Sequence, residues 1–283
     1  MLSLFLILLL QYSLIISSIT LNENYYPPAP FDVKIANSSV YLSAAASCGK
    51  EMYPTMHILG PTDSFQYKYT IYDKSSDTQG YIGIQPTESK IWIVYRGTTS
   101  VTNWLDDSEI ILKSIDFCEG CKVHAGFKKC YDNTIDQVLT AIKTLSAAYP
   151  SYEIIVTGHS LGGAIATLVT SKLFKDGLYK PLHYSFGSPR VGNNEFSNWV
   201  KATFIGNRVT HYKDMVPHVP YESMGYVHIS SEIYEDEQHQ LHGCKGNDDP
   251  TCAEQFSFYQ TSPSDHTLYL DLPMYCANST MQN

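Results

Sequence analysis

The residues best suited to chemistry lie in the stretch Gly158-His159-Ser160-Leu161-Gly162, which Gly163 and Ala164 follow at once. A serine hydroxyl is a weak nucleophile at neutral pH, so it must be exposed and must have a base nearby. A tight turn between a strand and a helix exposes the serine, and it requires glycines because a side chain there would collide with both elements. The pattern therefore predicts a nucleophilic serine at position 160.

The flanking sequence supplies the strand and the helix that such a turn needs. Residues Tyr152–Thr157 form a short apolar, β-branched run that predicts a buried strand. Residues Ala164–Phe174 predict a helix, with Gly177 as a natural C-terminal cap. A glycine-x-serine-x-glycine match alone also fits an ordinary strand–helix turn, but this context favours the nucleophile.

A nucleophilic serine needs a base, and the base needs an acid that orients it. When the serine stands on this kind of turn, the acid follows it in the chain and the histidine comes last. Asp214 follows the predicted strand Arg208–Tyr212, and catalytic groups gather at strand ends in open α/β sheets. We interpret Asp214 as this acid rather than as a solvated loop residue.

Among the histidines that follow the acid in the chain, four are considered as candidates for the base: His228, His239, His242 and His266. His266, near the C-terminus, is the favoured candidate. His228 is the alternative and lies in an apparent strand over Tyr226–Ile233. His239 and His242 lie in an acidic, polar loop and are expected to face solvent.

The negative charge that develops on a substrate oxygen needs two N–H donors. One is expected to be the backbone N–H of Leu161, the residue after the nucleophile. The other should come from the loop that leaves the predicted strand Ile91–Tyr95. In that loop Gly97 allows a sharp turn, and Thr98 offers both a backbone N–H and a hydroxyl.

The segment after this loop has one largely apolar helical face. The face is formed by Val101, Trp104, Leu105 and Ser108. The segment is either a surface helix packed on the core or a lid over Ser160. Because it adjoins the predicted oxyanion loop, we favour the lid.

Strand and helix alternate through the central half of the chain. Apolar residues at helical spacing give the predicted helix Ala125–Ala148 one buried face. The other predicted elements are strands at Tyr67–Asp73, Gly80–Gln85 and His183–Phe186 and a helix at Asn193–Phe204. This alternation predicts an α/β fold with a mostly parallel central sheet and helices on both faces. A chain of 283 residues is long enough for one such domain.

The N-terminus indicates export. Residues 1–20 combine an apolar core with terminal small residues, the pattern of a signal peptide, which leaves residues 21–283 as a single domain. An uncleaved membrane anchor is the alternative. Sequons at Asn37 and Asn278 fit a secreted glycoprotein. The formal net charge of −9 argues against nucleic acid as a partner.

The chain has seven cysteines, most of which an exported protein would oxidise. Cys118 and Cys121 are expected to form a structural disulfide, since no second ligand pair is spaced for zinc. Cys244 and Cys252 bracket a polar loop and are expected to pair. Cys130, close to the buried helix face, is most simply a free core thiol.

Motifs spread from Tyr67 to His266 resemble those of the fungal-type class 3 lipases. These motifs are the stretch 158–164, Tyr95-Arg96-Gly97-Thr98, Asn103-Trp104, Cys118-Glu119-Gly120-Cys121, Val123-His124-Ala125-Gly126-Phe127, Phe186-Gly187-Ser188-Pro189-Arg190-Val191-Gly192 and Asp214-Met215-Val216-Pro217. The resemblance implies an α/β-hydrolase fold and no metal or organic cofactor. It also implies a site made of the triad Ser160, Asp214 and His266, the oxyanion donors Thr98 and Leu161, and a lid around Trp104. Threonine at position 98 departs from the serine that is frequent in the family, but it keeps the hydroxyl.

The resemblance further implies a secreted carboxylester hydrolase, foremost a triacylglycerol lipase. An esterase on soluble esters, such as feruloyl esters, and a catalytically silent lipid-binding protein are the alternatives. The apolar Trp104 and Leu105 favour a lipid substrate at an oil–water interface. The family also suggests that Cys48 and Cys276 tie the two ends of the domain together. The segment Leu241–Gln255 has no counterpart in the family pattern and could reshape the acyl groove.

Overall fold

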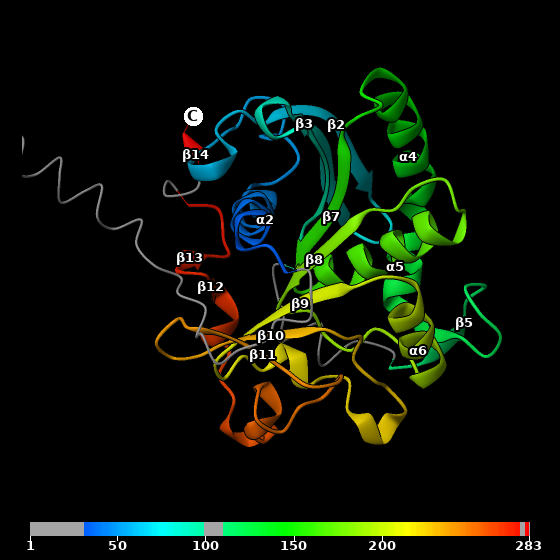
Figure 1. Cartoon of the computed structure of the whole chain (residues 1–283), viewed down its shortest axis with the longest axis vertical. Helices are drawn as coiled ribbons and strands as arrows, with labels where there is room; N and C mark the ends of the chain where they lie inside the picture. The colour runs from blue at the N-terminus through cyan, green and yellow to red at the C-terminus, as the bar shows by residue number, and fades with distance from the viewer. Residues whose placement is uncertain (1–30, 99–109, 278–280, 283) are drawn as a thin grey trace, which may run out of the picture.

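The computed structural model describes residues 31–98, 110–277 and 281–282 (Figure 1). The expected signal peptide and the expected lid residues Val101, Trp104 and Leu105 lie outside the described residues. Within the described part of the chain, no helix is both long and apolar enough to cross a membrane.

A central eight-stranded sheet has the order β11-β10-β9-β8-β7-β4-β3-β2. Its strands are β2 (Gln66–Asp73), β3 (Thr78–Gln85), β4 (Lys90–Tyr95), β7 (Glu153–His159), β8 (Leu182–Phe186), β9 (Gly206–His211), β10 (Glu232–Glu235) and β11 (Leu241–Gly243). The strands from β4 to β10 in this order run parallel, and antiparallel strands extend both edges. The predicted mostly parallel sheet is confirmed.

Short strand pairs lie outside the central sheet. They are β1 (His57–Ile58) with β14 (Met281–Gln282), β5 (Leu112–Ser114) with β6 (Lys122–His124), and β12 (Leu268–Tyr269) with β13 (Leu272–Pro273). The last pair follows His266 directly in the chain, so its position matters for the site described below.

Helices cover both faces of the sheet, as predicted (Figure 1). The helices are α2 (Val33–Ala45), α4 (Ala125–Ala148), α5 (Leu161–Lys175) and α6 (Asn194–Thr203). Side chains alternate along each strand. In β4, Ile91 and Ile93 therefore pack into the core that α4 and α5 cover, whereas Trp92 and Val94 pack into the core that α2 covers. Two apolar cores thus fix the sheet that carries the site.

The predicted amphipathic helix is confirmed with its bounds, because α4 spans Ala125–Ala148. The residues expected on its inner face are all buried: Phe127, Tyr131, Ile135, Val138, Ile142 and Leu145. Gly177 follows α5 with φ +69°, the left-handed conformation expected of a residue just past a helix end.

The strand predicted over Tyr226–Ile233 is wrong over residues 226–231. Val227 forms an isolated bridge with Gly192, outside the named strands, and β10 begins only at Glu232. The chain therefore turns between these two pairings. His228 lies in this connection and is buried.

Disulfides join Cys48 to Cys276, Cys118 to Cys121 and Cys244 to Cys252. Cys130 is buried and forms no disulfide with the described cysteines. The Cys48–Cys276 bond links the segment that follows α2 to the C-terminal region, across a sequence separation of 228.

Replacing both Cys48 and Cys276 by serine should lower the free energy of unfolding by up to about 5 kcal/mol, since the bond closes a long loop in the unfolded chain. The Cys118/Cys121 double serine variant is the matched control, because that bond spans a separation of only 3. The same chain-entropy argument gives about 2 kcal/mol for it. Denaturant unfolding of both variants checks the difference, and equal losses would contradict it.

Candidate active site

Ser160 stands on a strained turn between β7 and α5. Its φ is +56° and its ψ is −129°. Residues other than glycine rarely adopt this backbone conformation. A Cβ on Gly158 would lie 2.4 Å from the carbonyl carbon of Gly162, and a Cβ on Gly162 would lie 2.3 Å from the oxygen of Tyr95. Only glycines permit this close packing of turn, strand and helix, so the local sequence fixes the serine on its turn.

His266 and Asp214 form a buried pair beside this turn. The Nδ1 of His266 lies 3.0 and 2.8 Å from the two carboxylate oxygens of Asp214. A carboxylate only accepts hydrogen bonds, so Nδ1 carries the proton and Nε2 keeps a lone pair. Among the described residues, neither Nε2 of His266 nor Oγ of Ser160 has a hydrogen-bond partner. Both atoms are thus available for proton transfer.

The carboxylate of Asp214 has further donors. Val216 N–H donates to Oδ1 at 2.8 Å, and the hydroxyl of Tyr269 donates to Oδ2. A Cβ on Gly187 would come within 3.0 Å of Asp214, Tyr269 and His266. These contacts fix the carboxylate in one orientation toward the imidazole.

His159, the residue before the serine, supports His266 from the side of the turn. The two imidazole rings lie 4.3 Å apart between centroids, and Nε2–H of His159 donates to the carbonyl of His266 at 2.8 Å. Burial, and next the nearby His266, hold the pKa of His159 well below its usual range. His159 therefore stays neutral and does not oppose a charge on His266. The position of His159 inside the serine motif is the available sequence signal for this supporting role. The motif alone predicts no role for His159.

The predicted oxyanion donors lie on two elements that meet at the serine. A Cβ on Gly97 would lie 2.9 Å from the carbonyl of His159 and 3.2 Å from the Cβ of Ser160, so the loop after β4 lies against the turn. Thr98 of this loop and Leu161 line one cavity of about 700 Å³. Leu161 opens α5, whose N-terminal end favours negative charge.

His228, the alternative base, is held elsewhere. Its Nε2–H donates to the carbonyl of Pro217 at 2.6 Å. Burial and the neighbouring Arg208 and Arg190 keep the pKa of His228 well below its usual range. A neutral histidine that donates to a carbonyl oxygen has the geometry of a structural residue.

His239 and His242, which were expected to face solvent, are only partly exposed, with 30% and 34% of their side chains accessible. Both are half-buried and both contact carboxylates. His239 Nδ1 lies 2.7 Å from Glu235, and His242 Nε2 lies 2.6 Å from Asp236. The acidic character of this loop, which suggested exposure, instead supplies partners for its histidines.

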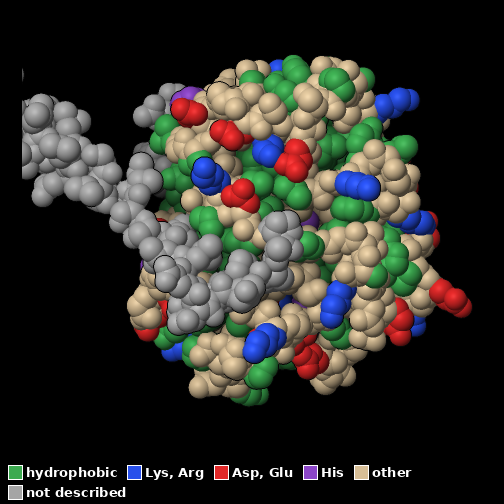
Figure 2. All heavy atoms as spheres, in the orientation of Figure 1, with side chains coloured by type: hydrophobic (Ala, Val, Ile, Leu, Met, Phe, Trp, Pro, Cys, Tyr) green, Lys and Arg blue, Asp and Glu red, His purple; other side chains and the backbone are tan. Residues whose placement is uncertain are grey.

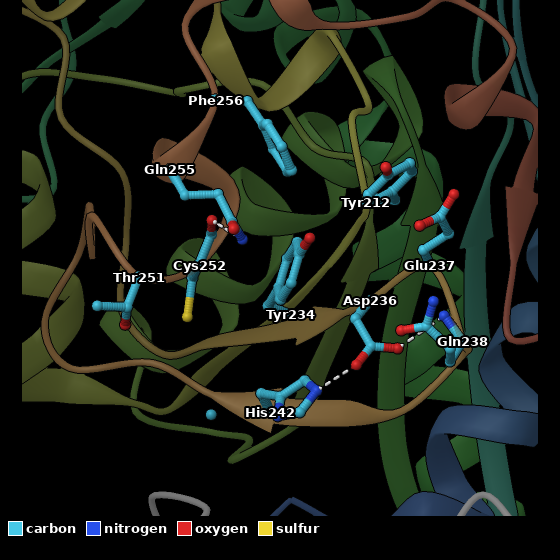
Figure 3. A pocket seen from close by; sticks show the side chains of 11 residues that line it. Tyr212, Tyr234, Asp236, Glu237, Gln238, His242, Thr251, Cys252, Gln255 and Phe256 are labelled. Carbon is cyan, nitrogen blue, oxygen red and sulfur yellow. Dashed lines mark hydrogen bonds and ion pairs between the residues drawn. The ribbon is translucent and has the colours of Figure 1, made fainter.

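The segment Leu241–Gln255 forms a braced loop. Besides the Cys244–Cys252 bond, the loop is held by Arg190, which is only 2% exposed and lies 3.0 Å from Asp248 and 2.6 Å from Glu254. The loop lines a pocket of about 500 Å³ at the ends of β9 and β10 (Figure 3). Its aromatic lining residues are Tyr212, Tyr234 and Phe256. Among the described residues, none from the loop lines the cavity at Thr98 and Leu161.

The strand–serine–helix turn at the carboxyl edge of a parallel sheet, with a His–Asp pair beside it, places the chain among the α/β-hydrolases. The family model described as Lipase (class 3) matches residues 92–224. Over these residues, which make up just under half of the chain, it is similar to that family, and the similar proteins of known name are fungal lipases.

Relatives of known name agree with this assignment. A "Secreted mono- and diacylglycerol lipase A" of Penicillium cyclopium is 36% identical over 188 residues, which are 66% of this chain and 61% of that protein. The chain thus spans less than two thirds of that relative. The Rhizomucor miehei lipase–propeptide complex superposes with a TM-score of 0.81 at 27% identity, covering 91% of this chain and 86% of that one. A triacylglycerol lipase described as having a serine protease triad superposes with a TM-score of 0.76 at 29% identity, covering 86% of this chain and 95% of that one.

Proposed function

We propose that this protein is a secreted carboxylester hydrolase that cleaves acylglycerols with Ser160, His266 and Asp214. The observation that carries the proposal is the buried His266–Asp214 pair, with its hydrogen bonds of 3.0 and 2.8 Å, beside a serine held at a φ of +56°. A serine, a histidine with a lone pair on Nε2 and an orienting carboxylate are the groups that form and activate the nucleophile in acyl transfer by a serine hydrolase.

In the proposed reaction, Nε2 of His266 takes the proton of Ser160 while Oγ attacks the ester carbonyl carbon. The N–H of Leu161, with the N–H and hydroxyl of Thr98, holds the oxygen that becomes negative. His266 then gives its proton to the departing alcohol oxygen, which leaves an acyl group on Ser160. Water then attacks the carbonyl carbon of this acyl group while Nε2 of His266 takes one of its protons. His266 passes this proton to Oγ as the bond between Oγ and the acyl carbon breaks, which frees Ser160 and releases the fatty acid.

Asp214 and His159 give His266 its properties in this cycle. The carboxylate fixes the tautomer with Nδ1 protonated, and it stabilises the imidazolium once His266 has taken the second proton. The low pKa of His159 keeps a second positive charge away from the same place. Proton uptake by His266 is thus favoured by the negative charge of Asp214 and by the absence of a positive charge on His159.

The proposed substrate class and location rest on the relatives and on the cysteines. The Penicillium relative is described as a secreted mono- and diacylglycerol lipase, and another solved relative as a triacylglycerol lipase. Disulfides that join six of the seven cysteines fit an oxidising compartment.

The substrate class is tested by comparing hydrolysis of emulsified diacylglycerol and triacylglycerol, a phospholipid vesicle and a soluble aryl ester. An acylglycerol hydrolase should have its highest kcat/KM on one of the two emulsions. Preference for the soluble ester would favour an esterase, and no hydrolysis of any of them would leave only lipid binding.

A further inference from the structure

The segment that carries His266 has an unusual backbone just beyond the histidine. Leu270 has φ +50° and Asp271 has φ +60°, and neither residue is a glycine. Such conformations persist only where the surroundings enforce them. The same segment supplies Tyr269, whose hydroxyl bonds Asp214. Contacts that fix the backbone of Leu270 therefore also help to position the side chains of His266 and Tyr269.

Glu235 holds this turn from the end of β10. Its side chain is 0% exposed, and its two carboxylate oxygens accept the N–H of Leu270 at 3.0 and 2.9 Å. A buried carboxylate is unfavourable unless it is paired and hydrogen-bonded. The buried carboxylate of Glu235 therefore has a specific structural task here, which is to hold the backbone at Leu270.

His239 is the side-chain partner of Glu235. Its Nδ1 lies 2.7 Å from Glu235 Oε1, and its Nε2 lies 3.1 Å from Asp271 Oδ1. The hydrogen bond to Glu235 is the main cause that raises the pKa of His239. One imidazole thereby bridges the buried carboxylate and the strained turn that the carboxylate holds.

His211 holds the same segment on the other side of His266. Its Nδ1–H donates to the carbonyl of Asp265 at 2.8 Å, the residue directly before His266. Glu235 and His211 are register partners on the neighbouring parallel strands β10 and β9. The rings of His211 and His239 also stack, with centroids 5.6 Å apart. The ends of the adjacent strands β9 and β10 thus bind the His266 segment on both sides of the histidine, at Asp265 and at Leu270.

We propose that Glu235 is a positioning residue for His266 and acts together with His239 and His211. It would hold residues 265–271 so that Nε2 of His266 faces Ser160. The proposal rests on the proposed function, since it concerns the same histidine. Glu235 contacts neither Ser160 nor the predicted oxyanion donors among the described contacts, so its effect passes through the backbone.

The test begins with Glu235→Ala, which removes both acceptors of the Leu270 N–H. Misplacement of a catalytic group by about 1 Å lowers rates by about 100-fold, so kcat should fall by about that factor while KM stays nearly unchanged. Glu235→Gln keeps the size and one acceptor but loses the charge that pairs with His239. It should show a smaller loss of kcat in the same direction.

Glu232→Gln is the matched control. Glu232 lies on the same strand, is 1% exposed, and bonds Arg208 at 2.9 Å and Thr210 at 2.7 Å. Its loss should destabilise the protein at least as much as Glu235→Gln, because it leaves a buried arginine without its carboxylate. It should nevertheless leave kcat nearly unchanged. If kcat falls in both variants in proportion to the loss of stability, Glu235 has only a structural role and the proposal is overturned.

A second measurement separates this proposal from the proposed function. The Nδ1 proton of His266, identified by its absence in His266→Ala, reports the His266–Asp214 hydrogen bond in a proton NMR spectrum whether or not an ester is cleaved. Glu235→Gln and His211→Ala should shift or broaden this resonance, and Glu232→Gln should not. An unchanged resonance in both test variants would overturn the positioning role. A wild-type protein that cleaves no ester would instead overturn the function alone.

Discussion

Replacing Ser160 by alanine is expected to lower kcat for ester hydrolysis by a factor on the order of 10⁴ to 10⁶. The variant loses the only nucleophile of the proposed mechanism, and no acyl-enzyme can form. Steady-state hydrolysis of a soluble aryl ester measures the loss directly, because that substrate needs no lipid surface.

The structure supplies a stringent control for this variant. Ser185 is also a buried serine, on the neighbouring strand β8, but it is not on the turn. Ser185→Ala should retain activity within a small factor. An active Ser160→Ala protein would remove the basis of the proposed mechanism, whereas an inactive one must still melt cooperatively to count in its favour.

Replacing His266 by alanine is expected to have an effect of similar size, on the order of 10⁴-fold or more in kcat. The imidazole both activates Ser160 and protonates the leaving alcohol, so its loss affects the two halves of the cycle. Hydrolysis of the same soluble ester, with folding checked by circular dichroism, measures this loss.

His228→Ala is the matched comparison for the base. His228 is as buried as His266, but its Nε2 is bonded to the Pro217 carbonyl. The change should lower stability, since it leaves a cavity, while the remaining folded protein keeps its kcat. The assignment of the base fails if His228→Ala is the inactive variant and His266→Ala the active one.

The fold was predictable because hydrophobic periodicity and glycine placement report local structure. The bounds of α4, the order of strands and helices around β7, and Gly177 at φ +69° follow from such local signals. The strand assigned to Tyr226–Ile233 failed for a non-local reason. Val227, near its start, pairs with Gly192 outside the central sheet, and β10 begins only at Glu232.

The sequence also pointed to the serine, the aspartate and the histidine, since chain order and strand ends carry that information. It did not reveal what supports them. His239 was assigned to a solvated acidic loop and Glu235 was given no role, because no local pattern shows that the His266 segment folds back onto β10. The contacts of His159 and Tyr269 with the triad are likewise tertiary, although His159 directly precedes Ser160 and Tyr269 lies three residues after His266 in the sequence.

The space-filling view shows acidic and basic side chains intermixed over the face in view, without a large patch of one charge (Figure 2).

The most direct test of the proposed nucleophile is to label the protein with a fluorophosphonate and locate the adduct by peptide mass spectrometry. Attack by an activated serine expels fluoride and leaves a phosphonate ester on its Oγ. We predict a single adduct on Ser160 that forms in step with the loss of ester hydrolysis and is strongly slowed in His266→Ala. Complete inactivation with the adduct on another residue, and Ser160 unmodified, would contradict the account.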